Sequence, residues 1–104
     1  MGAEQVMSNL GSLQPELKAI VSGQKVTIDW SWQGHAETVD MIEIHVDRND
    51  GKGFVFLAND TTPGYTDTAP WPTNLIKWKY KAIYHRGDQS VGQWSLDLPV
   101  TVGG

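Results

Sequence analysis

Apolar and polar residues alternate with a period of two along several stretches of the chain. In residues 25–33, apolar side chains occupy positions 26, 28, 30 and 32, and polar residues fill the positions between them. Residues 39–48 and 75–85 show the same alternation. Because successive side chains of a β-strand point to opposite faces of a sheet, each stretch predicts a strand with one buried face and one exposed face.

Turn-forming residues divide these stretches at regular intervals. Asp50-Gly51 favours a tight hairpin, and Pro70 and Pro72 cannot donate to a strand ladder, so their segment is expected to cross between sheets. Short strands separated by turn residues every 8–12 positions are typical of a β-sandwich. The pattern predicts an all-β, antiparallel fold of seven strands at residues 15–21, 25–33, 39–48, 54–58, 65–68, 75–85 and 93–102.

The length of 104 residues indicates one domain. Residues 1–12 show no clear period and are expected to form an N-terminal tail, and residues 13–102 form the sandwich. A chain of this length can close one hydrophobic core but leaves little for a deep catalytic cleft. Alternation predicts that the core contains Trp30, Ile44, Trp78, Tyr80 and Val100.

Several segments, taken in order, resemble a fibronectin type III domain over residues 13–102. Residues 26–30, ending in Trp30, are similar to the second strand of that family. Tyr65-Thr66-Asp67-Thr68 is similar to its Tyr-x-Asp-Thr stretch, and Trp78-Lys79-Tyr80-Lys81-Ala82 to its aromatic-rich sixth strand. The resemblance implies an immunoglobulin-like sandwich found in tandem or beside other domains, and its style is similar to that of bacterial modules.

One position departs from the family pattern. The family has a tyrosine where Trp78 stands, and the resemblance implies that its hydroxyl fixes the segment that crosses between sheets. The indole N–H of Trp78 is a donor that could replace it, in a different geometry.

Charge and composition narrow the classes of partner. The net charge is −4 and the chain has only eight Lys and Arg residues, which argues against a nucleic-acid partner. The absence of Cys excludes disulfides and Cys-based metal sites. No apolar run approaches the roughly 20 residues of a membrane span, so no membrane insertion is expected.

The compartment stays open between two interpretations. The start of the chain lacks the basic and apolar regions of a signal peptide. The protein is therefore either cytosolic or a module of a longer chain, which could be extracellular or exposed at the cell surface. The final Thr101-Val102-Gly103-Gly104 reads like the start of a linker and favours the module.

Catalytic and metal-binding patterns are missing from the sequence. The three histidines are far apart, no Gly-x-Ser-x-Gly elbow occurs, and no glycine-rich phosphate loop is present. Residues 47–51 resemble the start of a calcium loop, but Gly51 comes one position early and Ala58 stands where the loop needs Glu. We therefore expect no enzyme, no cofactor and no metal site.

Two loops should meet at one end of the sandwich and form a binding edge for a protein partner. Its candidate residues are His35 and Glu37 from one loop and Arg86, Gly87 and Asp88 from the other. The Arg-Gly-Asp tripeptide resembles the integrin-binding motif of the family's cell-adhesive member, which implies adhesion as an alternative. A plain hairpin, in which Gly87 supplies a positive φ, is the simpler interpretation.

Three further tryptophans raise a carbohydrate alternative, because exposed indole faces can stack on sugar rings. These are Trp32, Trp71 and Trp94. Alternation turns Trp32 and Trp94 inward, which favours closure of the sandwich ends over an exposed platform.

A stripe of outward lysines at positions 77, 79 and 81 is expected to face Glu43, Asp47 and Asp97 across neighbouring strands and to be neutralised by them. The sequence therefore predicts a non-catalytic module acting as a spacer or protein-binding unit.

Overall fold

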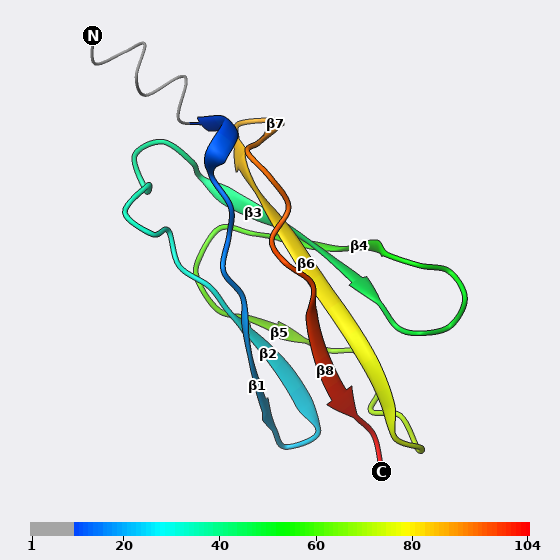
Figure 1. The fold of residues 1–104 in the computed structure, drawn as a ribbon. Coiled ribbons are helices and arrows are strands. Elements are labelled where there is room, and N and C mark those ends of the chain that lie inside the picture. Colours follow the sequence, from blue (N-terminus) through cyan, green and yellow to red (C-terminus); the bar gives the residue numbers. More distant parts are fainter. Residues whose placement is uncertain (1–9) are drawn as a thin grey trace, which may run out of the picture.

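The computed structural model describes residues 10–104, and residues 1–9 of the expected tail lie outside this range. Two antiparallel sheets pack face to face (Figure 1), as the sequence predicts. A short 3-10 helix, Leu10–Ser12, precedes them. The three-stranded sheet has the order β1-β2-β5, formed by Lys18–Ser22, Lys25–Asp29 and Tyr65–Asp67. No helix among the described residues is long and apolar enough to cross a membrane.

The five-stranded sheet has the order β4-β3-β6. The other edge of β6 pairs with β8 over residues 76–80 and with β7 over residues 84–86. Its strands are β3 Met41–Asp47, β4 Val55–Asp60, β6 Ile76–Arg86, β7 Gln89–Val91 and β8 Leu98–Val102.

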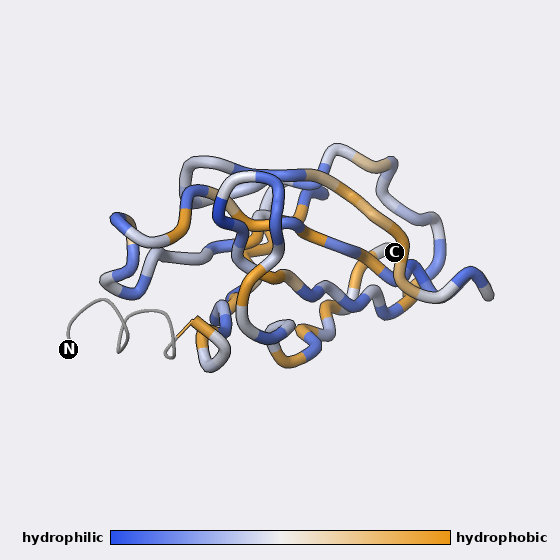
Figure 2. The backbone as a smooth tube through the Cα atoms, turned by 90° about the horizontal axis from the view of Figure 1, so that it is seen from above, coloured by the Kyte–Doolittle hydropathy of each residue, from blue (hydrophilic) through white to orange (hydrophobic). Residues whose placement is uncertain are grey.

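The core fills the space between the two sheets. Trp30, Ile44, Trp78, Tyr80 and Val100 are all buried, and the inward residues of β2 and β3 join them. Seen from above in Figure 2, apolar and polar positions alternate along both layers of the chain. The period-two pattern therefore reflects how strands in a sandwich present one face to the core.

The strand count is eight, not seven, because the expected loop contains an additional short strand, and the predicted last strand is shortened. The expected loop at 86–92 contains β7, and the strand expected at 93–102 begins only at Leu98. Between them the Gln93 N–H donates to the Leu13 carbonyl at 2.7 Å instead of to β6. The hydroxyl oxygen of Ser95 also accepts the Ala82 N–H at 2.9 Å, in place of a backbone carbonyl. These two bonds take residues 92–97 out of the regular ladder.

One edge of the sandwich is closed by a buried carboxylate. Asp67, at the end of β5, accepts hydrogen bonds from both terminal nitrogens of Arg48 at 3.0 and 3.1 Å and from the Tyr80 hydroxyl at 2.6 Å. The Ala69 N–H donates to the same carboxylate at 3.1 Å. We call Arg48, Asp67 and Tyr80 the Asp67 clasp. It ties the three-stranded sheet to the five-stranded sheet.

The hydrogen bonds of the Asp67 clasp identify the side chain that fixes the crossing segment. Tyr80 supplies the hydroxyl, so the indole of Trp78 is not the substitute that its position suggested. Trp78 instead lies beneath the Arg48 guanidinium, 4.4 Å from the ring centroid, and supports the cation. Burial alone would raise the pKa of Asp67, but hydrogen bonds from Arg48, Tyr80 and Ala69 outweigh it and lower that pKa.

Replacing Gly92 by alanine should destabilise the fold in two ways. Gly92 has a φ of +79°, and a Cβ there would lie 2.2 Å from the Leu13 carbonyl oxygen. Gly51→Ala is the matched control, because Gly51 has a φ of +86° and open space around it. In urea unfolding, the control should lose about 1–2 kcal/mol and Gly92→Ala roughly 1–3 kcal/mol more. Equal losses would show that the N-terminal segment does not press on Gly92.

The Asp67 clasp should make stability depend on acid pH. The folded pKa of Asp67 lies below its unfolded value, so the native state binds fewer protons in this window and gains stability as pH rises. Asp67→Asn should cost about 3 kcal/mol near neutral pH. That difference from the native chain should shrink as pH falls below about 4. Urea midpoints from pH 2 to 7 measure it, and a difference that stays flat across this range would contradict the assignment.

Candidate functional site

The two loops of the predicted binding edge lie close together, and the Asp40 carboxylate links them. Arg86 ends β6, and Gly87 and Asp88 form the two-residue turn into β7. The Asp40 carboxylate accepts the Gly87 N–H at 2.9 Å, and the Asp40 N–H donates to the His85 carbonyl at 2.9 Å. The structure therefore joins the turn to the end of the other loop.

The predicted residues at this end do not converge on one site. The His35 carbonyl accepts the N–H groups of Thr38 and Val39, so it organises its own loop, and Glu37 is exposed. His35 lines a hollow of about 460 Å³ with Gln33 and Tyr84, whereas Glu37 and the 86–88 turn do not line it. The Tyr84 hydroxyl already donates to Ser31 and accepts from Gln33. The polar groups here mostly satisfy one another.

The Arg-Gly-Asp tripeptide is part of a tight hairpin. Arg86 is paired with Gln89 in the ladder, and Gly87 has a φ of 61°, which suits the first position of a two-residue turn. This geometry favours the hairpin interpretation over a loop that holds both charges out for a receptor.

The outer face of the five-stranded sheet carries a second polar cluster. The two carboxylate oxygens of Glu43 accept from the Nε2 atoms of His45, at 2.5 Å, and His85, at 2.7 Å. Burial alone would raise the pKa of Glu43, but the bonds and charges of the two histidines lower it. Among residues 10–104, no group of three or more His, Asp or Glu side chains is arranged to hold a metal ion.

Trp94 lies on this outer face, and its predicted inward position is wrong. Its ring packs edge-on against His45 at 4.7 Å, and Lys81 Nζ lies 4.5 Å from its centroid. The break at residues 92–97 shifts the alternation, so Trp94 and Leu98 face opposite ways. Lys81 also sits over Phe54. The expected neutralisation of the lysine stripe is not seen among the described residues: Asp47 lies opposite Lys79 in the strand register without an ion pair, and Glu43 engages histidines.

The tryptophans do not form a shared exposed platform. Trp32 packs edge-on against Trp30 at 4.7 Å, Trp71 packs against the core, and Trp94 is covered by His45 and Lys81. A sugar ring stacks on an exposed indole face, whereas the side chains of all three tryptophans are partly buried, which does not favour this role.

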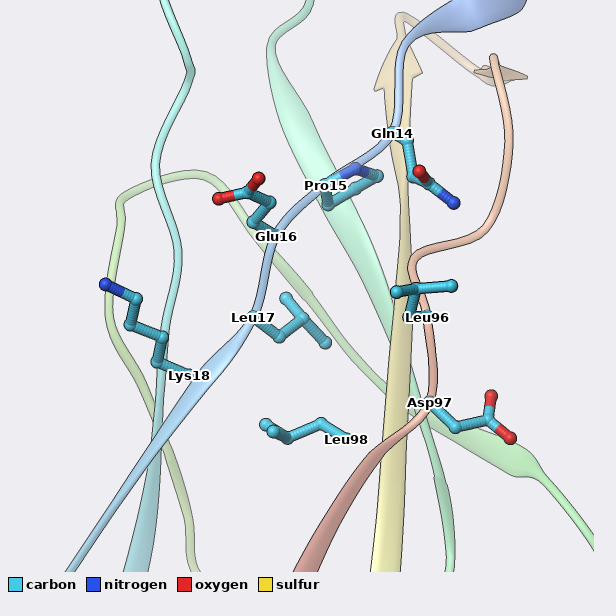
Figure 3. Close-up of a pocket in the computed structure, with 8 residues that line it drawn as sticks. All are labelled: Gln14, Pro15, Glu16, Leu17, Lys18, Leu96, Asp97 and Leu98. Atoms are coloured by element: carbon cyan, nitrogen blue, oxygen red, sulfur yellow. The ribbon is translucent and has the colours of Figure 1, made fainter.

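A groove that the sequence did not indicate runs along the edge opposite the Asp67 clasp. Here the segments that lead into β1 and β8, the edge strands of the two sheets, face each other (Figure 3). The groove has a volume of about 370 Å³. Residues 14–18 line one side of it and residues 96–98 the other. We call it the open-edge groove.

Leucines form the interior of the open-edge groove. Figure 3 shows Leu17 and Leu98 extending toward each other across the gap, while Glu16 and Asp97 point away on either side. Leu96 completes the apolar lining and is 82% exposed. The Gln14 side-chain amide donates to the Trp94 carbonyl at 2.8 Å and holds the two walls together at one end. The sequence did not predict the groove because its pattern indicated one continuous strand through residues 93–98.

Comparisons with known proteins agree with the fold. No family model and no curated protein matches the sequence. The solution structure of a fibronectin type III domain from human KIAA0970 protein is similar with a TM-score of 0.65 and 11% identity, covering 96% of this chain and 81% of that one. A second, the domain of human fibronectin type III domain containing protein 3, gives 0.65 and 15% identity, covering 89% and 87%. The chain is therefore a β-sandwich with a fibronectin type III-like fold.

Proposed function

We propose that this domain is a non-catalytic protein-binding module and that the open-edge groove is its recognition site. The observation that carries the proposal is the exposure of Leu96 beside the facing pair Leu17 and Leu98. A leucine left in water forgoes roughly 1.5–3 kcal/mol of burial free energy, which a partner could recover by covering it. Concave sites with an apolar lining and a polar rim are where proteins bind ligands.

The other candidate surfaces support a binding role less well. Both carboxylate oxygens of Glu43 are already bonded to His45 and His85. The 86–88 turn is held by Asp40 and presents no apolar anchor. Apolar and aromatic anchors dominate the binding energy of most protein interfaces. Leu96 is the most exposed large apolar side chain among the described residues, so the groove offers such an anchor.

A non-catalytic role agrees with the chemistry of the described residues. Catalysis would need a nucleophile beside a base or titratable groups converging on a cleft. The ionisable groups with shifted pKa values gather around Asp67 and Glu43, with Tyr84 as a separate case. The Asp67 and Glu43 carboxylates are each bonded to their own neighbours, and the Tyr84 hydroxyl is bonded to Gln33 and Ser31, so each has a structural explanation.

A spacer role is compatible with the same fold. The 3-10 helix Leu10–Ser12 and the C-terminus lie at opposite ends of the sandwich (Figure 1), which suits a unit placed in series with others. Fold likeness alone does not decide between spacer and binder. The groove favours the binder.

A displayed library of random 12-residue peptides, selected on the folded domain, tests the proposed function. Selected peptides should bind the native domain and lose at least about tenfold in affinity on Leu96→Asp, because a carboxylate in the groove opposes apolar contact. Leu96 is 82% exposed, so the substitution should change stability by no more than about 0.5 kcal/mol.

Leu75→Asp is the matched control for this experiment. Leu75 is 73% exposed and does not line the groove, so the variant should bind selected peptides like the native domain. Selections that yield no binder, or binders that are indifferent to Leu96, would reject the groove as the recognition site.

A further inference from the structure

We infer that the open-edge groove takes an extended, cationic segment of a partner protein, which adds as a fourth strand to the free edge of β1. This inference rests on the proposed function and names its binding mode and partner.

The backbone of β1 presents unpaired groups toward the groove side. β1 and β2 are joined by the two-residue turn Gly23-Gln24, both with a φ of 59°, so the closing pair Ser22 and Lys25 is hydrogen-bonded. Bonded and non-bonded pairs alternate along an antiparallel ladder. The pairs of Val21 and Ala19 with β2 are therefore non-bonded. Their N–H and C=O groups point to the free edge of the sheet.

The facing edge of β8 is blocked to an incoming strand. The β6–β7 hairpin closes on the bonded pair Arg86 and Gln89, and even-numbered residues of β6 therefore bond toward β7 and β8. Ala82 follows this rule, because both its N–H and its carbonyl bond to Ser95. Pro99 pairs with the odd-numbered Lys79, so the N of Pro99 faces the free edge and has no hydrogen to donate.

The remaining free edges are less suited to accept a strand. β5 and β7 have three residues each, and the pairing of β4 with β3 is irregular between Ile44 and His45. Short or bulged edges resist strand addition, whereas β1 is a regular five-residue edge without proline. Of the described strands, β1 is the one that combines free backbone groups with an apolar groove beside it.

Side chains of β1 set the pattern that the partner must match. Ala19 and Val21 pair with the buried Ile28 and Val26, so they lie on the inner face, and Val21 is still 48% exposed at the open edge. A strand added beside them would direct alternate side chains to the same inner side, over Leu96 and Leu98. The partner strand should therefore carry apolar residues at alternate positions.

Charge selects a cationic partner over a second copy of this chain. The charged rim residues are two carboxylates, Glu16 and Asp97, against one ammonium, Lys18. The whole chain has a net charge of −4, so two copies repel each other at long range. Lysine or arginine beside the apolar anchors would complement the rim and speed association.

A defined peptide series tests this inference. The probe is a nine-residue peptide with leucine or valine at alternate positions, threonine between them, and lysine at both ends. It should bind the native domain in calorimetry, and the same peptide ended by glutamate should bind at least about fivefold more weakly. N-methylation at alternate positions should abolish binding for one set of positions and spare the other, because only one set donates to β1.

Ala19→Pro is the decisive variant of the protein. It removes an N–H that faces the free edge and not β2, so the domain should still fold, as edge strands tolerate such a proline. Affinity for the probe should fall at least about tenfold. Ala19→Ser keeps the N–H and is the matched control, and the amide spectrum of each variant reports its fold.

The outcomes separate this inference from the proposed function. Loss of binding on both Leu96→Asp and Ala19→Pro supports strand addition. Loss on Leu96→Asp alone leaves the groove as a binding site and overturns strand addition. Equal effects of both N-methylated sets, or no binding of the probe at all, also overturn it. A dimer of the native chain that Ala19→Pro dissociates would make the occupant a second copy and overturn the partner assigned here.

Discussion

The Asp67 carboxylate is the interaction on which the shape of the sandwich depends. It is nearly inaccessible to water and would be unfavourable there alone, but four hydrogen bonds from Arg48, Tyr80 and Ala69 compensate. Because these partners come from both sheets, the same bonds that satisfy the carboxylate also set the distance and angle between the sheets along that edge. Trp30 adds a second link nearby by donating its indole N–H to Asp60 at 2.9 Å.

The opposite edge of the sandwich has no such polar link between β1 and β8 among the described contacts. It is lined by leucines and held at one end by the side chain of Gln14. A sandwich that is fixed along one edge can leave the other edge apart without losing its core. The groove lies on the edge that the buried charge does not hold, and the proposed function and mode of binding concern that edge.

Sequence pattern was sufficient for the fold class and for the buried faces of the long strands. The buried faces of β2 and β3 follow directly from period-two alternation. In β6 the alternation holds from Ile76 to Tyr80, but residues 82–85 are buried on both faces. The alternation pattern gave a wrong prediction at residues 92–97, where Gln93 bonds to Leu13 and the Ser95 side chain replaces a backbone acceptor. Those bonds depend on which distant residues lie nearby, and alternation along one segment contains no information about them.

The candidate site shows the same limit. The sequence predicted that the loops of His35 and Gly87 lie at one end of the sandwich, and Asp40 connects them there. It had no means of finding the groove, whose walls are separated by about 80 positions in the chain. Nor could it foresee that Tyr80, two residues after Trp78, would provide the hydroxyl that fixes the crossing segment.

The bond between Gln14 and Trp94 has a consequence for the order in which the molecule is built. It joins residues 80 positions apart, so the entropy of closing nearly the whole chain must be overcome before it forms. During synthesis the first wall exists long before the second one leaves the ribosome. The groove is therefore absent from a chain that stops before residue 96, and a partner that recognises it would distinguish a domain with both walls from a shorter nascent chain.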